Sequence, residues 1–377
     1  MIYLDNSATT FYKPKAVIKA VQNALTVFPA NPGRSGHQES LKAAMVIEKT
    51  REKLSEFVGA ERPEKVIFTQ SCTDALNLAI LGSVVEGGHV ICTINDHNSC
   101  LRPLFELQNA GKITVSVASP SKPHILSAED ISPLIRENTY MVCVNHLSNV
   151  DGMPADIDAI GELCAEKNIT FLVDGAQSIG HIKIDMLKQH IDFLALAPHK
   201  GLYAPQGIGS LVMSSHVKPI PLRYGGTGTD TFSLLQPTNL PEYYESGTLS
   251  TPAISGLGAG LDFVNENFTN IAEKLEDLTT CLHYELSRLD TEIYTHPDNA
   301  FGVLSFNINR IDSRTVGTFL DEKYGICVRA GAHCAPLKHK NIGTEELGTI
   351  RVSLSYFNTY SEIEKFVRAI KDFIRRK

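Results

Sequence analysis

The chain has 377 residues, of which 43% are hydrophobic and 20% charged, as in an ordinary globular protein long enough to form two domains. Its formal net charge of −7, with no long basic run, argues against nucleic acid or an anionic membrane as a partner. The sequence lacks both a membrane-spanning apolar stretch of about 18 residues and the basic-then-apolar start of a signal peptide, so we expect a cytoplasmic protein.

Strand-like and helix-like segments alternate from about residue 14 to residue 213. Apolar residues at helical spacing predict helices over 15–27, 41–58, 73–81, 101–109, 127–135 and 157–167. Short apolar runs predict strands over 66–69, 90–93, 113–117, 140–144, 169–173, 193–197 and 208–213. Continuous apolar strands between helices indicate an α/β fold whose mainly parallel sheet is covered on both faces. Such sheets bind ligands at the carboxyl ends of their strands.

The pattern loosens over 214–250, where glycine and proline accumulate, and we place a connecting region there. The elements expected beyond it are helices over 251–267, 271–289 and 314–324, strands near 303–306, 326–329 and 350–353, and a terminal helix behind a capping box of Ser361 and Glu364. We therefore expect a large domain over 14–250. A smaller α+β domain is expected from 1–13 together with 251–377.

The stretch FLALAPHKGLYAPQGIGSL delivers a lysine at the point where a buried strand should end. His199 and Lys200 follow the apolar run, and the glycines and prolines after them predict a tight loop. Desolvation there disfavours the ammonium form, and a neutral amine can attack an aldehyde. Lys200 is therefore a candidate Schiff-base lysine, although a solvated loop lysine would give the same local pattern.

A carboxylate follows the preceding predicted strand. Asp174, in DGAQS, could keep a ring nitrogen protonated, which is what pyridoxal phosphate needs in order to draw electrons from a substrate carbanion. The alternative is an aspartate that only caps a helix. With Lys200 one strand later, the pair supplies an acid for a ring nitrogen and an amine for an aldehyde.

Two more loops follow predicted strands. The small polar residues of QSCTD leave backbone N–H groups free at a helix start, where they can bind a phosphate, and Thr73 adds a hydroxyl. Helix capping alone explains this pattern equally well. His97 could stack on a planar cofactor ring and relay protons, or it could be an ordinary surface histidine.

The C-terminal part holds a cysteine and an arginine in unusual settings. Cys334 lies in the loop RAGAHCAP, where neighbouring positive charge and flanking glycine and proline favour a reactive thiol over an inert buried one. Arg351 stands in an otherwise apolar strand, where it is costly unless an anion pairs with it, and an amino-acid carboxylate is the expected partner. The eight cysteines form no CxxC pair, so we expect reduced thiols and no metal site.

From YLDNSATT near its start to RVSLSYFNT near its end, the chain resembles the cysteine desulfurases of the class V aminotransferase fold, which are fold type I pyridoxal-phosphate enzymes. The most specific pieces are DGAQSIGH, APHKGLYAPQGIG and RAGAHCAPL. The last of these resembles the group II, SufS-like branch and its selenocysteine lyase relatives. The resemblance implies a homodimer that converts L-cysteine into L-alanine, keeps the sulfur as an enzyme persulfide and passes it to an acceptor protein or a small thiol.

The resemblance also implies a role for each matching residue. Lys200 would bond the cofactor aldehyde and move the α-proton, and Cys334 would take the sulfur. The other implied cofactor contacts are Asp174 (ring nitrogen), Gln177 (ring hydroxyl), His97 (ring face), Cys72, Thr73 and His199 (phosphate) and Thr248 (phosphate of the other subunit). The implied carboxylate binders are Asn149, Arg351 and Arg329. The positions that depart from the family pattern are Cys72, Ala197 and Gly33.

Two other functions fit the same sequence. A selenocysteine lyase or a related C–S lyase would use the same site, but selenium leaves without obligatory help from Cys334. A non-catalytic sulfur carrier or scaffold could keep the fold alone. The combination of Asp174, His97, Lys200 and Arg351 argues against a carrier, because a carrier needs no cofactor.

Overall fold

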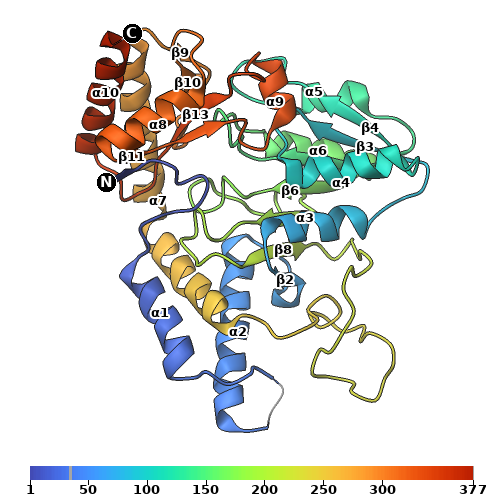
Figure 1. Cartoon of the computed structure of the whole chain (residues 1–377). Helices are drawn as coiled ribbons and strands as arrows, with labels where there is room; N and C mark the ends of the chain where they lie inside the picture. Colours follow the sequence, from blue (N-terminus) through green and yellow to red (C-terminus); the bar gives the residue numbers. More distant parts are fainter. Residues whose placement is uncertain (34–35, 377) are drawn as a thin grey trace.

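The computed structural model describes residues 1–33 and 36–376, and this part of the chain is built around a large sheet (Figure 1). From one side to the other its strands are β2 (Val66–Thr69), β8 (Gly209–Met213), β7 (Phe193–Leu196), β6 (Thr170–Asp174), β5 (Thr139–Asn145), β3 (Gly88–Thr93) and β4 (Ile113–Ala118). Strand β8 pairs antiparallel with β2 and β7, whereas the other neighbouring strands pair in parallel. The predicted mainly parallel sheet is confirmed. The carboxyl ends of β2, β3, β5, β6 and β7 therefore share one edge, called the carboxyl edge below.

Helices cover both faces of this sheet, as the uniformly apolar strands predict. Successive strand residues point to opposite faces. Ile67 accordingly joins one core cluster with Leu76 of α3, and its neighbour Phe68 joins another with Leu54 of α2. The helices on the first face are α3 (Cys72–Leu81) and α4 (Asn98–Asn109), and those on the second include α2 (Gln38–Phe57) and α6 (Ile157–Lys167).

One long helix replaces two predicted ones. Helix α1 (Lys15–Thr26) packs against α7 (Thr251–Ser287), and α7 also packs against α2 (Figure 1). The expected separation into helices 251–267 and 271–289 is wrong. Val264 and Ile271 are both buried and lie seven residues apart, which is about two helical turns, so the apolar face continues in phase across the polar residues between them.

The C-terminal part contains a second sheet with strands in the order β12 (Arg329–Gly331), β13 (Thr349–Ser353), β10 (Val303–Asn307) and β9 (Glu292–Ile293). Its helices are α8 (Ser313–Tyr324), α9 (Pro336–Asn341) and α10 (Tyr360–Arg375). The predicted capping box of Ser361 and Glu364 is wrong. Thr359 has an extended backbone and accepts a hydrogen bond from the Glu362 N–H, so Thr359 and Glu362 form the box and Ser361 lies in the first turn.

Helix α5 (Ala128–Ile131) is shorter than the predicted helix over 127–135. The residues after it, Ser132–Leu134, form a 3₁₀ turn that contains Pro133. A proline has no N–H to donate to the preceding helical turn, and its ring clashes with that turn, so an α-helix cannot run through this position without distortion. The chain then leaves the turn in an extended conformation at Ile135.

The N-terminal segment lies beside the C-terminal part of the chain. Strand β1 (Ile2–Tyr3) pairs in parallel with β11 (Ile326–Cys327). This pairing agrees with the assignment of 1–13 and 251–377 to one domain, but the division into two domains stays a prediction. Among the described helices, none has both the length and the apolar character that crossing a membrane requires.

The connecting region 214–250 is described throughout and contains no helix or strand. A buried ion pair ties its end to the sheet. Two nitrogens of Arg51 on α2 lie 2.8 and 2.9 Å from the two carboxylate oxygens of Glu245. The N–H of Phe68 donates to the same carboxylate at 2.7 Å. This network holds Glu245, and with it the nearby Thr248, against α2 and β2.

We expect Arg51→Ala to lower the free energy of unfolding by about 3–5 kcal/mol, because it leaves the buried carboxylate of Glu245 without its counter-ion. Urea unfolding followed by circular dichroism measures the loss. Lys42→Ala on the same helix is the control: its pair with Glu39 is exposed, and removing it should cost at most about 1 kcal/mol. Equal losses in the two variants would contradict a stabilising role of the buried pair.

Candidate active site

Residues predicted to carry chemistry gather at the carboxyl edge of the large sheet. Each follows the end of a strand, so the sheet topology alone brings the loops together. The residues and the strands they follow are Cys72 and Thr73 after β2, His97 after β3, Asn149 after β5, Asp174 at the end of β6, and His199 and Lys200 after β7. Arg329, Cys334 and Arg351 come from the second sheet and its loops.

Lys200 lies in a turn that is packed too closely for any side chain at the next position. A Cβ on Gly201 would lie 1.8 Å from the carbonyl oxygen of Ile179. Within the described residues, the ε-amine of Lys200 makes no hydrogen bond or ion pair. Burial lowers the pKa of this amine from its ordinary value, and Asp174 opposes that shift. This lowered pKa agrees with the desolvated lysine that the sequence predicts, and its bond to a cofactor stays a prediction.

The carboxylate of Asp174 is buried and only partly satisfied. Its Oδ1 accepts a hydrogen bond from the Ala176 N–H at 2.9 Å, and the thiol of Cys72 lies 3.6 Å from the same oxygen. Burial, and next the charge of Asp174, raise the pKa of the Cys72 thiol well above its ordinary value, so this cysteine is a neutral donor. The second oxygen, Oδ2, has no hydrogen bond within the described residues and can accept one from a ligand.

Hydroxyl groups connect His97 to the start of α3. The Ser99 hydroxyl lies 2.8 Å from Nδ1 of His97 and 2.8 Å from the Thr73 hydroxyl. The N–H of Ser99 also donates to Nδ1 at 3.1 Å, which places the imidazole proton on Nε2. Burial lowers the pKa of His97, so its ring is neutral near pH 7. Ser99 was not predicted from the sequence.

The start of α3 is a capped helix N-terminus, and its use as an anion site stays a prediction. Ser71 caps the helix by accepting from the Asp74 N–H at 3.1 Å. The carboxylate of Asp74, which would repel an anion, is instead paired with Arg223 at 2.8 Å. A Cβ on Gly209 of β8 would lie 2.1 Å from the carbonyl carbon of Ser71, so only glycine lets this turn approach the sheet.

The loop that carries Cys334 is held on two sides. The backbone carbonyl oxygen of Cys334 accepts a hydrogen bond from the Asn98 N–H at 2.8 Å, which places the loop beside His97. The amide Nδ2 of Asn149 donates to the carbonyl of His333 at 2.6 Å. His333 and Cys334 both adopt left-handed φ angles, 47° and 58°. All eight cysteines are described, and Cys334 is the exposed one among them. A fixed loop therefore presents one accessible thiol.

A second buried ion pair supports this loop from behind. Nζ of Lys338, on α9 directly after the loop, lies 2.6 Å from Oδ2 of Asp151, and both side chains are almost fully buried. Asp151 follows Asn149 in the segment after β5. The segment after β5 therefore makes two contacts: Asn149 holds the Cys334 loop, and Asp151 holds α9. Nothing in the local sequence indicates the Asp151–Lys338 ion pair.

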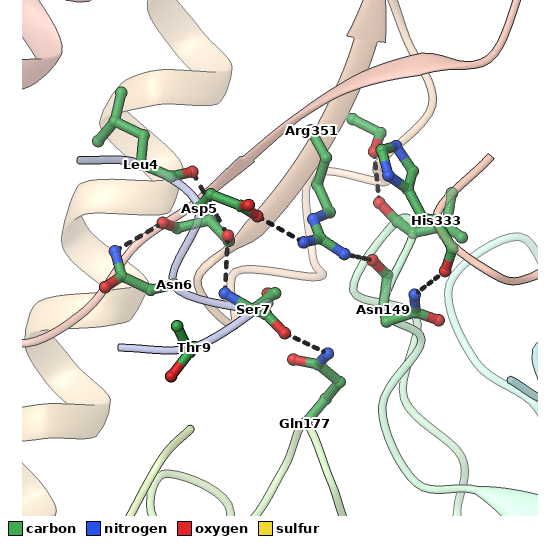
Figure 2. Close-up of polar contacts among 12 residues, drawn as sticks. Leu4, Asp5, Asn6, Ser7, Thr9, Asn149, Gln177, His333 and Arg351 are labelled. Atoms are coloured by element: carbon green, nitrogen blue, oxygen red, sulfur yellow. Dashed lines mark hydrogen bonds and ion pairs between the residues drawn. The ribbon is translucent and has the colours of Figure 1, made fainter. Parts of the chain in front are cut away.

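Arg351 is buried, and the structure supplies it with a carboxylate that the sequence did not predict (Figure 2). Its Nη2 lies 2.7 Å from Oδ1 of Asp5, and its Nη1 donates to the carbonyl oxygen of Asn149 at 2.9 Å. Its Nε has no partner within the described residues. The sequence predicts that an anion pairs with Arg351, and the chain itself supplies one in Asp5. Binding of an amino-acid carboxylate stays a prediction, and the Nε–H remains free for it.

Arg329 and Arg351 stand directly opposite each other in the antiparallel pair β12–β13. Like charges at such positions repel, so this arrangement favours an anion between or beside them. Arg329 is exposed and Arg351 is buried, which suits a ligand that enters from solvent and ends against the buried guanidinium.

Gln177 and Thr248 differ in how the chain places them. Gln177 is buried, and its amide donates to the carbonyl of Ser7 at 3.1 Å (Figure 2). Thr248 is exposed and lines a cavity of about 500 Å³ together with Gln70 and Asp74, whereas Lys200 does not line it. Gln177 lines a small cavity together with Lys200, so the fold of one chain brings Gln177, but not Thr248, to the lysine.

The family model for class-V aminotransferases matches residues 2–366. The chain belongs to the class-V aminotransferase family. Among other class-V members, a probable cysteine desulfurase of Methanothermobacter thermautotrophicus is 34% identical over 374 residues, which cover 96% of this chain and 92% of that protein. A cysteine desulfurase of Escherichia coli O157:H7 is 32% identical over 387 residues, with 98% and 93% covered.

Solved structures show the same class-V fold. The apo structure of a cysteine desulfurase from Thermococcus onnurineus NA1 matches with a TM-score of 0.94 and 29% identity, and covers 100% of this chain and 95% of that one. A cysteine desulfurase from Escherichia coli matches with a TM-score of 0.89 and 26% identity, with 99% and 94% covered. The fold implied by the sequence resemblance is therefore confirmed.

Proposed function

We propose that this chain is a pyridoxal-phosphate-dependent cysteine desulfurase, which converts L-cysteine to L-alanine and moves the sulfur to Cys334 as a persulfide. One observation carries the proposal: the unpaired amine of Lys200 lies at the carboxyl edge of the sheet, and the loop of the exposed Cys334 thiol is hydrogen-bonded to Asn98, next to His97, at the same edge. Relatives and structural neighbours named cysteine desulfurase over almost the whole chain support it.

The residues at the carboxyl edge fit pyridoxal phosphate because polar atoms that the cofactor would need lack partners in the described chain. These atoms are the ε-amine of Lys200, Oδ2 of Asp174 and the buried Nδ1 of His199. Lys200 would hold the aldehyde carbon and Asp174 the ring nitrogen. The other residues expected to hold the cofactor are Gln177 at the ring hydroxyl, His97 over the ring, and Cys72, Thr73 and His199 at the phosphate.

When bound, pyridoxal phosphate supplies an electron sink for the pair that remains on the substrate Cα after deprotonation. Lys200 takes the Cα proton, since burial lowers its pKa and so favours the neutral amine. Arg351 and Arg329 bind the substrate carboxylate. His97 is neutral and can donate its Nε2 proton or take one beside the thiol loop.

Sulfur transfer then balances without an external oxidant or reductant. Sγ of Cys334 forms a bond to the substrate sulfur, the Cβ–S bond breaks, and its electron pair stays on carbon. The proton that Cys334 gives up ends on Cβ, and Lys200 returns a proton to Cα. The products are L-alanine and a persulfide that keeps the S–H hydrogen of the substrate. An acceptor protein or a small thiol then takes the terminal sulfur.

We also propose a homodimer in which Thr248 reaches the cofactor phosphate of the partner subunit. Thr248 is exposed and makes no hydrogen bond within the described residues. The connecting region that carries it also exposes Phe232, Leu234 and Leu235 almost completely, and exposed apolar groups of this kind mark interaction surfaces. A second copy would cover them and complete the phosphate site.

The test is an amino-acid panel. The protein is reconstituted with pyridoxal phosphate and given L-cysteine, L-selenocysteine or L-cysteine sulfinate in the presence of a reducing thiol, and alanine is measured together with sulfide, selenide or sulfite. We expect L-cysteine to yield alanine and sulfide in equal amounts. Turnover of L-selenocysteine without turnover of L-cysteine would make the protein a selenocysteine lyase, and a colourless, inactive protein would favour a carrier.

A further inference from the structure

Asp5 and Arg351 form an ion pair where the substrate carboxylate is expected to bind (Figure 2), and Arg329 stands opposite Arg351 in the β12–β13 pair. We propose that Asp5 is a specificity-determining residue, which neutralises one of the two facing arginines so that the site takes an amino acid with a single acidic group and rejects dianionic ones. This inference rests on the proposed function, because it concerns the same carboxylate subsite.

The charges around Asp5 are unequal. Arg329 and Arg351 are direct cross-strand partners, so two guanidinium groups converge on one side of the β12–β13 pair. Oδ1 of Asp5 lies 2.7 Å from Nη2 of Arg351. The guanidinium of Arg329 makes no hydrogen bond or ion pair with any described residue. Two positive charges and one negative charge leave one net positive charge, which matches one carboxylate.

Asp5 is a permanent part of this site. Its neighbours in the chain are hydrogen-bonded to Ser353, which lies two residues after Arg351 on β13. Nδ2 of Asn6 donates to the Ser353 carbonyl at 2.9 Å, the Ser7 N–H donates to the Ser353 hydroxyl at 2.9 Å, and the Ser353 N–H donates to the Leu4 carbonyl at 2.7 Å. These bonds fix the backbone of Asp5 beside β13, so its carboxylate stays within reach of Arg351 when a substrate arrives.

Arg351 keeps binding capacity while Asp5 is in place. A guanidinium has five N–H groups. The contacts of Arg351 to Asp5 and to the Asn149 carbonyl use two of them, and its buried Nε has no partner among the described residues. A ligand carboxylate can therefore bind beside Asp5. Once the first carboxylate has offset Arg329, a second acidic group on the ligand would meet the charge of Asp5, and this repulsion grows in proportion to the ligand charge.

Asp5→Asn tests this idea because the amide oxygen can still accept the Nη2 hydrogen bond while the negative charge is gone. Using the full-length protein loaded with pyridoxal phosphate, dissociation constants of L-alanine and L-aspartate are measured from the change in cofactor absorbance. We expect the preference for L-aspartate over L-alanine to rise about tenfold in Asp5→Asn and to fall about tenfold in Arg329→Gln. The double variant, with one net positive charge restored, should return to within about twofold of the wild type.

Asn6→Ala is the control, because it removes side-chain hydrogen bonds that anchor the N-terminal segment but keeps the Asp5 carboxylate. An unchanged preference in Asp5→Asn, an equal change in Asn6→Ala, or a double variant that behaves like Asp5→Asn would overturn the inference. Arg329→Gln, an exposed position, decides the question if Asp5→Asn does not fold. Turnover of L-cysteine by the wild type is measured separately. A protein that shows the expected binding preferences but forms no alanine would refute the proposed activity and leave the inference about Asp5 intact.

Discussion

Lys200→Ala is expected to lower the formation of alanine from L-cysteine by at least about 10³-fold, because the variant loses both the amine that holds the cofactor and the base for the Cα proton. The purified variant should also lose the visible absorbance of the lysine-bound cofactor. Both are measured on protein reconstituted with the same excess of pyridoxal phosphate. A variant that keeps the absorbance band and the turnover would remove Lys200 from the mechanism.

Lys65→Ala is a matched control for this result. Lys65 is also buried, and burial lowers the pKa of its amine as well. It precedes β2, however, and so lies at the opposite edge of the sheet from the candidate site. We expect Lys65→Ala to keep both the cofactor absorbance and the turnover. Equal losses in the two variants would mean that removing any buried lysine damages the protein, and would leave the chemistry of Lys200 unsupported.

Cys334→Ala is expected to lower desulfuration of L-cysteine by roughly 10³-fold while the cofactor still binds with its normal absorbance, because the variant lacks only the nucleophile that accepts the sulfur. Alanine release and protein-bound persulfide are the two measurements. Turnover of L-selenocysteine should persist to a greater extent, since selenium leaves more readily without help from a thiol.

Cys281→Ala is the control for the cysteine experiment. Cys281 lies on α7, away from the carboxyl edge, and is only partly exposed. It should leave desulfuration and persulfide formation unchanged. If Cys334→Ala still forms protein-bound persulfide at the wild-type level, then another thiol accepts the sulfur. Cys72 would be the first to examine, because its thiol lies 3.6 Å from Oδ1 of Asp174 at the carboxyl edge.

Much of the fold could be predicted because its signals are local. Strands such as β2, and helices such as α6, begin and end where the apolar spacing places them. Predictions failed where a signal depended on packing elsewhere. Helix α7 continues through a polar gap because Val264 and Ile271 face the same core. The terminal helix begins at Tyr360 because Thr359, and not Ser361, has the extended backbone that a cap needs.

The candidate site divides in the same way. Lys200, Asp174 and His97 follow strand ends, so their spacing along the chain was enough to place them at one edge of a parallel sheet. Their roles toward a cofactor stay predictions. Ser99, Asp151 and Asp5 were missed, because each acts through a contact that its neighbours in the sequence do not suggest.

Local spacing was sufficient for the alternation of strands and helices and for the identity of the lysine, the carboxylate and the thiol, because each of these depends on a few consecutive residues. The counter-ion of Arg351 and the anchoring of the Cys334 loop required the folded chain. Asp5 and Arg351 are 346 residues apart, and Asn149 and His333 are 184 apart. A buried charge takes its partner from whatever segment packs against it, and that choice is made only when the two sheets come together.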